Sequence, residues 1–138
     1  MKKKVICIDK NNAICFLVKT VLKNNYQVIT EHDSMKAIEL LHNNPEIDAI
    51  ILSINSAEDE FYEILHHIST SSFFSSTPVI ILSESEDLQK LAAKNPNVIA
   101  CFTKPFDPLK LLNLMNEHVL NNVESQILSR KRKIFHLN

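Results

Sequence analysis

Five short apolar runs, separated by segments with helical spacing, are the feature that most constrains the fold of this chain. Four of the runs, at residues 5–8, 49–52, 79–82 and 99–102, are continuous, and the fifth, at 26–30, is interrupted by Gln27. Apolar residues at successive positions over such short lengths are typical of strands buried on both faces of a parallel sheet. Because strands and helical segments alternate five times, we predict one α/β domain in which helices cover both faces of the sheet. The length of 138 residues suits a single domain.

The segments between the runs predict which helical faces lie against the sheet. For the first helix we expect an inward face of Ala13, Phe16, Leu17, Thr20 and Val21. For the second helix we expect Met35, Ile38 and Leu41, with Ala37 as a further candidate. For the third helix we expect Phe61, Ile64, Leu65 and Ile68. Polar residues that can cap helices precede these segments, namely Asn11 or Asn12, Asp33 or Ser34, and later Ser83 or Ser85.

The chain contains no glycine, and this excludes several functional classes. Phosphate-binding loops of P-loop NTPases and the usual dinucleotide binders need glycines for close backbone approach, so neither can be built here. The three cysteines, Cys7, Cys15 and Cys101, form no C-x-x-C pair and no zinc-like spacing with histidine. The six histidines likewise form no ligand set along the sequence. We therefore expect no metal centre and no cofactor.

Charge and hydropathy limit the partners. The formal net charge is −1, which argues against a nucleic-acid-binding domain. No run of about 18 apolar residues is present, so we expect no membrane span. The apolar run that follows Lys2, Lys3 and Lys4 is too short for the core of a signal peptide, and we expect a cytoplasmic protein.

Polar and charged residues follow the runs at the points where parallel strands would end. Asp9 and Lys10 follow the first run, Ser53 the third, Ser83 the fourth, and Lys104 comes shortly after the fifth. In open parallel sheets, ligands bind at the carboxyl ends of the strands. We therefore expect one acid, two hydroxyls and two ammonium groups to share one surface.

These residues carry a resemblance to a known family. The phrases VICIDKNN, DAIILSIN, TPVIILSES and CFTKPF, in this order, resemble the receiver domain of two-component response regulators over residues 3–120. The resemblance implies the CheY-like, flavodoxin-like (βα)5 fold, a doubly wound parallel sheet with strand order 2-1-3-4-5. It also implies a site in which acids after the first strand hold Mg²⁺ and an aspartate ending the third strand accepts a phosphoryl group. By this match, Asp9 keeps the first acid, Ser83 the hydroxyl and Lys104 the lysine that contacts the phosphoryl group.

Three departures from the family pattern concern the chemistry directly. Lys10 stands in place of the second acid, Ser53 in place of the phosphoacceptor aspartate, and Cys101 in place of the aromatic residue that reorients on activation. Asn55, two positions beyond Ser53, belongs to the same degenerate phosphorylation site. Mg²⁺ requires carboxylate oxygens in near-octahedral geometry, and we expect Asp9 to face two lysines instead. We therefore predict that Mg²⁺ binding is lost and that no catalytic set is intact.

The leading functional hypothesis is a stand-alone pseudo-receiver that is not an enzyme and acts through protein–protein interaction in bacterial two-component signalling. Its expected partner is a histidine kinase or an effector, bound on the face between Glu84 and Asn121. Three alternatives remain open at this point. The chain could be a phosphorelay receiver modified at another residue such as Asp9, a flavodoxin-like cofactor binder or small enzyme, or a thiol-redox protein.

The C-terminal end differs from the rest in composition. We assign residues 1–120 to the receiver-like domain and residues 121–138 to a helical extension with a basic end, since Arg130 to Lys133 are all basic. Val123, Ile127 and Leu128 recur at helical spacing in this extension. Four interpretations of this segment stay open: a frayed end, a homodimer through the last helix, a partner-binding helix, and a patch for an acidic surface.

Overall fold

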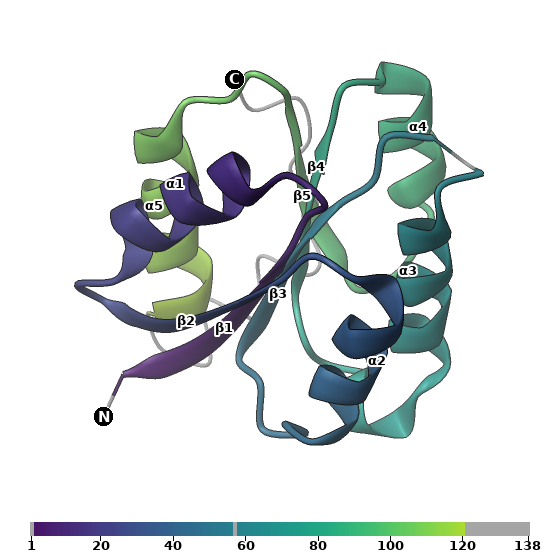
Figure 1. Ribbon diagram of the computed structural model, residues 1–138, viewed down its shortest axis with the longest axis horizontal. Coiled ribbons are helices and arrows are strands. Elements are labelled where there is room, and N and C mark those ends of the chain that lie inside the picture. Colours follow the sequence, from purple (N-terminus) through teal and green to yellow (C-terminus); the bar gives the residue numbers. More distant parts are fainter. Residues whose placement is uncertain (1, 57, 121–138) are drawn as a thin grey trace.

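The computed structural model describes residues 2–56 and 58–120, which form a five-stranded parallel sheet with helices on both faces (Figure 1). The strands are β1 (Lys3–Ile8), β2 (Tyr26–Glu31), β3 (Ala49–Ser53), β4 (Val79–Ser83) and β5 (Val98–Thr103). Their order in the sheet is β2-β1-β3-β4-β5, and every neighbouring pair is parallel. The predicted fold class and strand order are therefore confirmed.

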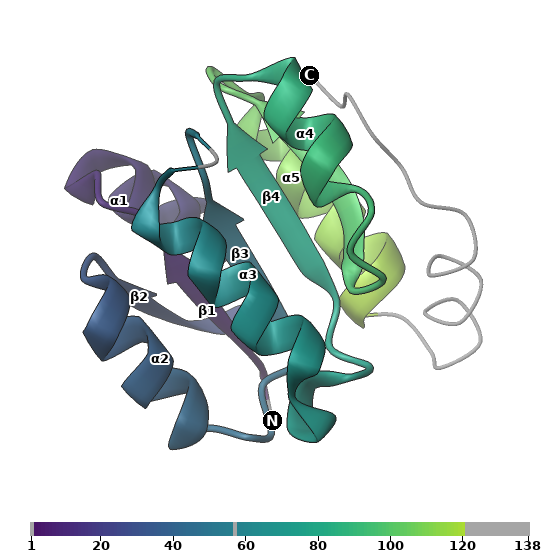
Figure 2. The same ribbon diagram turned by 90° about the vertical axis from the view of Figure 1, so that its right-hand side faces the viewer.

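The helices cover the two faces unequally. Helices α1 (Asn12–Leu22) and α5 (Pro108–Met115) lie on one face, and α2 (Ser34–His42), α3 (Glu60–Thr70) and α4 (Glu86–Ala92) lie on the other (Figures 1 and 2). A short 3-10 turn, η1 (Ser72–Phe74), follows α3, and a π-helical segment, η2 (Asn116–Leu120), continues α5. Within the described ranges, none of the helices combines the length and the apolar character that crossing a bilayer requires.

Alternation along the strands divides the core into two layers. In β1, Val5 and Cys7 pack under α1 and α5, whereas Ile6 and Ile8 pack under α2 and α3. Successive strand side chains point to opposite faces of a sheet, so a strand covered on both faces must be apolar at every position. All residues of β3 and β4 are buried, which explains why these strands read as continuous apolar runs.

Helix starts follow the capping residues that the sequence offers. The side chain of Asn11 accepts hydrogen bonds from the amides of Ala13 and Ile14, and that of Asp33 accepts from the amide of Lys36. The hydroxyl of Ser85, rather than that of Ser83, caps α4. Each cap satisfies an amide that has no partner within its own helix.

Two predicted inward faces are wrong in part. In α1 the predicted Ala13, Phe16 and Thr20 are exposed, Phe16 by 73%, and only Leu17 and Val21 pack partly against the core. The buried residues of this helix are Cys15, Val18 and Leu22. The helix carries apolar residues on opposite faces, so their spacing alone does not show which face is buried. Packing against the sheet selects that face. In α2, Met35 is 76% exposed, and Ala37 and Leu41 are the buried residues.

The third predicted face, that of α3, is confirmed, since Phe61, Ile64, Leu65 and Ile68 are all buried. The expected extension of the last helix, with Val123, Ile127 and Leu128, lies outside the described residues, as do the basic residues at its end.

Candidate functional site

A shallow pocket of about 520 Å³ lies at the carboxyl ends of the strands, where the sequence predicts the site. Four of the predicted site residues line it, namely Asp9, Lys10, Asn55 and Lys104. Asn11, Ile14, Glu84 and Pro105 complete the lining. Because two acids and two lysines face this pocket, its charges are balanced.

Asp9 and Lys104 form a buried ion pair in this pocket. The ammonium nitrogen Nζ of Lys104 lies 3.0 Å from Oδ2 of Asp9, and the two side chains are only 10% and 3% exposed. The other carboxylate oxygen, Oδ1, accepts a hydrogen bond of 2.9 Å from the amide of Asn11. Both oxygens of Asp9 therefore already have a protein partner.

Lys10 departs from the expectation that it faces Asp9. Its ammonium group lies 3.3 Å from Oδ1 of Asp59 and 3.8 Å from Oε1 of Glu60, and 5.3 Å from the ring centroid of Phe61. The acids at the start of α3 attract Lys10 toward that helix. Lys10 is consequently a half-exposed lysine at the rim of the pocket, 53% exposed at its side chain.

Asp59, which is not among the residues predicted from the sequence, organises this rim. Its carboxylate accepts hydrogen bonds from the amides of Phe61 and Asn55 and caps α3. Burial raises the pKa of Asp59, but these two amides and Lys10 outweigh burial, so its pKa lies below the ordinary value. The available signal was an aspartate directly before a helical segment, which is an N-cap pattern.

Ser53 and Ser83 lie at the ends of β3 and β4, beneath the pocket rather than in its lining. Ser53 is 2% exposed, and its hydroxyl has no hydrogen-bond partner among the described residues. The hydroxyl of Ser83 instead accepts from the amide of Ser85 at 3.1 Å, and its carbonyl accepts from the amide of Lys104 at 2.8 Å. Of the five residues that the sequence predicts on one surface, only Asp9 and Lys104 are joined to each other by a side-chain bond.

Cys101, which the family resemblance predicts at the position of the aromatic switch, is fully buried in β5 against the α4 side of the sheet. The thiol of Cys101 contacts the backbone carbonyl of Gln89 in α4, a residue that is 1% exposed and is not among those predicted from the sequence. Its amide donates a hydrogen bond of 2.7 Å to Oγ1 of Thr103, and thereby joins α4 to the end of β5. The signal in the sequence was a glutamine placed between the apolar residues Leu88 and Ala92 of this helix.

The three cysteines are free thiols and all are buried. A hydrogen bond with Cys15, and then burial, raise the pKa of Cys7. The same hydrogen bond lowers the pKa of Cys15. Their burial agrees with the structural role that small apolar side chains have in a core.

An open parallel sheet in the order 2-1-3-4-5, with charged residues gathered where its strands end, defines a doubly wound protein of the flavodoxin-like class. Residues 5–116 match the family model of the response regulator receiver domain. The chain therefore belongs to the response regulator receiver family. Receiver domains are signalling modules that act with histidine kinases and effector proteins.

Two bacterial proteins are similar in sequence. The chain is 32% identical to the protein PilG of Pseudomonas aeruginosa over 119 residues, which cover 84% of this chain and 87% of PilG. It is 29% identical to the regulatory protein VanRc of Enterococcus gallinarum over 114 residues, which cover 81% of this chain. The chain spans about half the length of VanRc, since the match covers 48% of that protein.

Solved structures confirm the fold. The chemotaxis response regulator CheY4 of Vibrio cholerae has a TM-score of 0.73 and 24% identity, with 84% of this chain and 98% of CheY4 covered. The phosphorylated cyanobacterial phytochrome response regulator RcpA has a TM-score of 0.72 and 24% identity, with 88% and 96% covered. At this identity the likeness concerns the fold alone.

Proposed function

We propose that this receiver domain signals through protein contacts and does not carry a phosphoryl group on an acid at the end of β3. The observation that carries the proposal is Ser53. A neutral hydroxyl, 2% exposed and without a partner among the described residues, ends the strand where the family's acceptor aspartate would stand. A serine hydroxyl is a weak nucleophile unless a base lies beside it, and the pocket's buried acid, Asp9, is already paired with Lys104.

The donor set at the strand ends also does not suit Mg²⁺. This ion needs several oxygen ligands in near-octahedral geometry, with one or two carboxylates among them. Asp9 has both oxygens engaged, and Lys10 stands where a second acid would be. In the part of the chain that the structure describes, no three acids, histidines or cysteines are grouped in a way that could hold a metal ion. No step of the proposed function therefore passes through Mg²⁺.

The proposed docking face is formed by α4, β5 and α5, between Glu84 and the end of α5. Leu109 of α5 is 64% exposed, which offers an apolar side chain to a partner. The bond from Gln89 to Thr103 holds α4 against β5 without a phosphoryl group. The proposed partner is a histidine kinase or an effector of two-component signalling in the cytoplasm, and it recognises a fixed surface rather than a switched one.

The test is treatment of the purified protein with a small phosphodonor and Mg²⁺, followed by mass spectrometry, with a parallel calorimetric Mg²⁺ titration. We expect no added phosphate and no Mg²⁺ binding at millimolar concentration. A gain of one phosphate that hydroxylamine removes would identify an acyl phosphate, and an ordinary phosphorelay role would replace the proposal.

A gain-of-function variant sharpens this experiment. Lys10→Asp combined with Ser53→Asp restores the two missing acids, so we expect weak Mg²⁺ binding and slow phosphorylation to return. Lys10→Asp combined with Ser53→Asn is the matched control, because asparagine has the same shape but cannot form an acyl phosphate. Equal labelling of the two double variants would place the modification elsewhere and would contradict the assignment of this site.

A further inference from the structure

Two histidines from neighbouring helices meet on the surface away from the strand-end pocket. His42 is the last residue of α2 and His67 lies in the last turn of α3, and these two helices lie side by side (Figure 2). The Nε2 atoms of the two rings are 2.8 Å apart, and the ring centroids are 4.8 Å apart. This pair could not be predicted from the sequence, because the two residues are separated by 25 positions.

We propose that His42 and His67 form a surface site for a divalent late transition metal ion, of the nickel, copper and zinc class. Neutral imidazole is a preferred ligand of these ions. The proposal concerns a site separate from the strand-end pocket and independent of the proposed signalling function.

The separation of the two nitrogens fits ligands of one ion. At metal–nitrogen distances of about 2.0–2.1 Å, two ligands at a right angle are about 2.9 Å apart, and two tetrahedral ligands are about 3.3 Å apart. The observed 2.8 Å is close to the right-angle value. This geometry favours tetragonal or octahedral ions such as Ni²⁺ and Cu²⁺, and an opening of about 0.5 Å would admit Zn²⁺.

The electrostatic surroundings also favour a cation. Both histidines lie at the C-terminal ends of their helices, where the free carbonyl groups carry partial negative charge.

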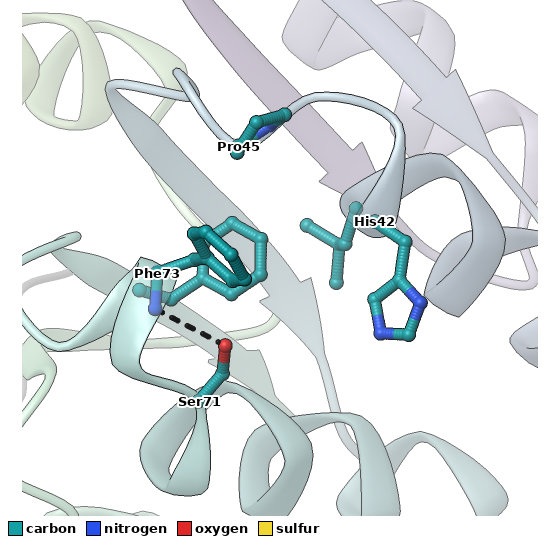
Figure 3. Close-up of a pocket in the computed structure, with 6 residues that line it drawn as sticks. His42, Pro45, Ser71 and Phe73 are labelled. Atoms are coloured by element: carbon teal, nitrogen blue, oxygen red, sulfur yellow. Dashed lines mark hydrogen bonds between the residues drawn. The ribbon is translucent and has the colours of Figure 1, made fainter.

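The remaining coordination positions are accessible. His42 is exposed, and it borders an apolar pocket of about 360 Å³ whose other side is formed by Phe73 (Figure 3). Among the described residues, no third histidine, cysteine or acid joins the pair to form a larger ligand group. Water or a small external ligand therefore completes the coordination of the bound ion.

The test is a calorimetric Ni²⁺ titration of the untagged full-length protein in a buffer without chelating components. We expect one site in the wild type. His42→Ala and His67→Ala should each weaken binding by at least about tenfold. Losing a residue that only hydrogen-bonds to a metal ligand typically costs about that much, and losing the ligand itself costs no less. His66→Ala is the matched control, since His66 is adjacent on α3 but lines the groove toward α4, and it should leave binding unchanged.

Two further measurements make the outcome unambiguous. Circular dichroism establishes that each variant is folded, and ¹⁵N chemical shifts of the imidazoles in the wild type should move on Ni²⁺ addition for His42 and His67. Absence of binding in the wild type would overturn the proposal and leave an ordinary histidine–histidine hydrogen bond. Equal binding by all three variants would place the ion elsewhere and would overturn it as well.

Discussion

Replacing Lys104 with methionine removes the cation that compensates the buried Asp9 carboxylate and leaves the rest of the side-chain volume in place. Breaking a buried ion pair by removing one partner typically costs 3–5 kcal/mol, because the remaining charge stays uncompensated. Here Asp9 keeps its hydrogen bond from the Asn11 amide and borders a pocket open to water. We therefore expect Lys104→Met to destabilise the domain by about 3 kcal/mol, the lower end of that range.

The reverse substitution should be milder. Asp9→Asn keeps the acceptor for the Asn11 amide, and the long side chain of Lys104 can turn its ammonium group into the pocket. We expect a loss of about 1–2 kcal/mol from this change. Because the double variant has no buried charge to compensate, its loss should be about 1–3 kcal/mol smaller than the sum of the two single losses.

Urea unfolding followed by circular dichroism measures these differences, and a loss of 3 kcal/mol corresponds to a Tm lower by about 10 °C for a domain of this size. Lys10→Met is the matched control, since Lys10 is half exposed and its pairs with Asp59 and Glu60 should contribute less than about 1 kcal/mol. If Lys104→Met costs no more than Lys10→Met, the buried pair does not compensate Asp9 and the reasoning is refuted.

Three further predictions follow from buried polar groups. Ser53→Ala should change the free energy of unfolding by less than about 0.5 kcal/mol or raise it, since the hydroxyl has no partner among the described residues. Ser83→Ala loses the hydrogen bond from the Ser85 amide and should cost about 1 kcal/mol. Urea unfolding measures both values. Burial raises the pKa of Tyr26, so the stability that its neutral form contributes is complete below about pH 10 and declines as the pH rises further. Tyr26→Phe should flatten this alkaline decline, although it also loses the hydrogen bond to Asn116. If stability still declines in the variant, another group is responsible. The three buried cysteines should not react with a thiol-specific dye within minutes under native conditions and should all react in denaturant, and one fast native thiol would revive the redox alternative.

Much of the fold was predictable because strands buried on both faces leave a local signature. Ala49–Ser53 and Val79–Ser83 are buried at every residue, so their apolar runs mark both strands without any knowledge of their neighbours. The polar residue that ends each run marks the carboxyl end of the sheet, and this placed Asp9 and Lys104 at one site. The strand order came from the family resemblance, since no single segment specifies which strand lies beside it.

What the sequence could not decide depends on contacts between segments far apart in the chain. The apolar residues of α1 occupy opposite faces, and only packing against the sheet and α5 selected the face of Val18 over that of Phe16. Lys10 was expected to face Asp9, but the start of α3 brings Asp59 within 3.3 Å of its ammonium group. The spacing of apolar residues along the chain indicates which side of one helix or strand is apolar. Ion pairs and ligand pairs depend instead on the distances between different helices and strands. For that reason the sequence determined the alternating α/β architecture and the serine that ends the third strand, and the tertiary structure alone decided the partners of the charged residues and the meeting of His42 with His67.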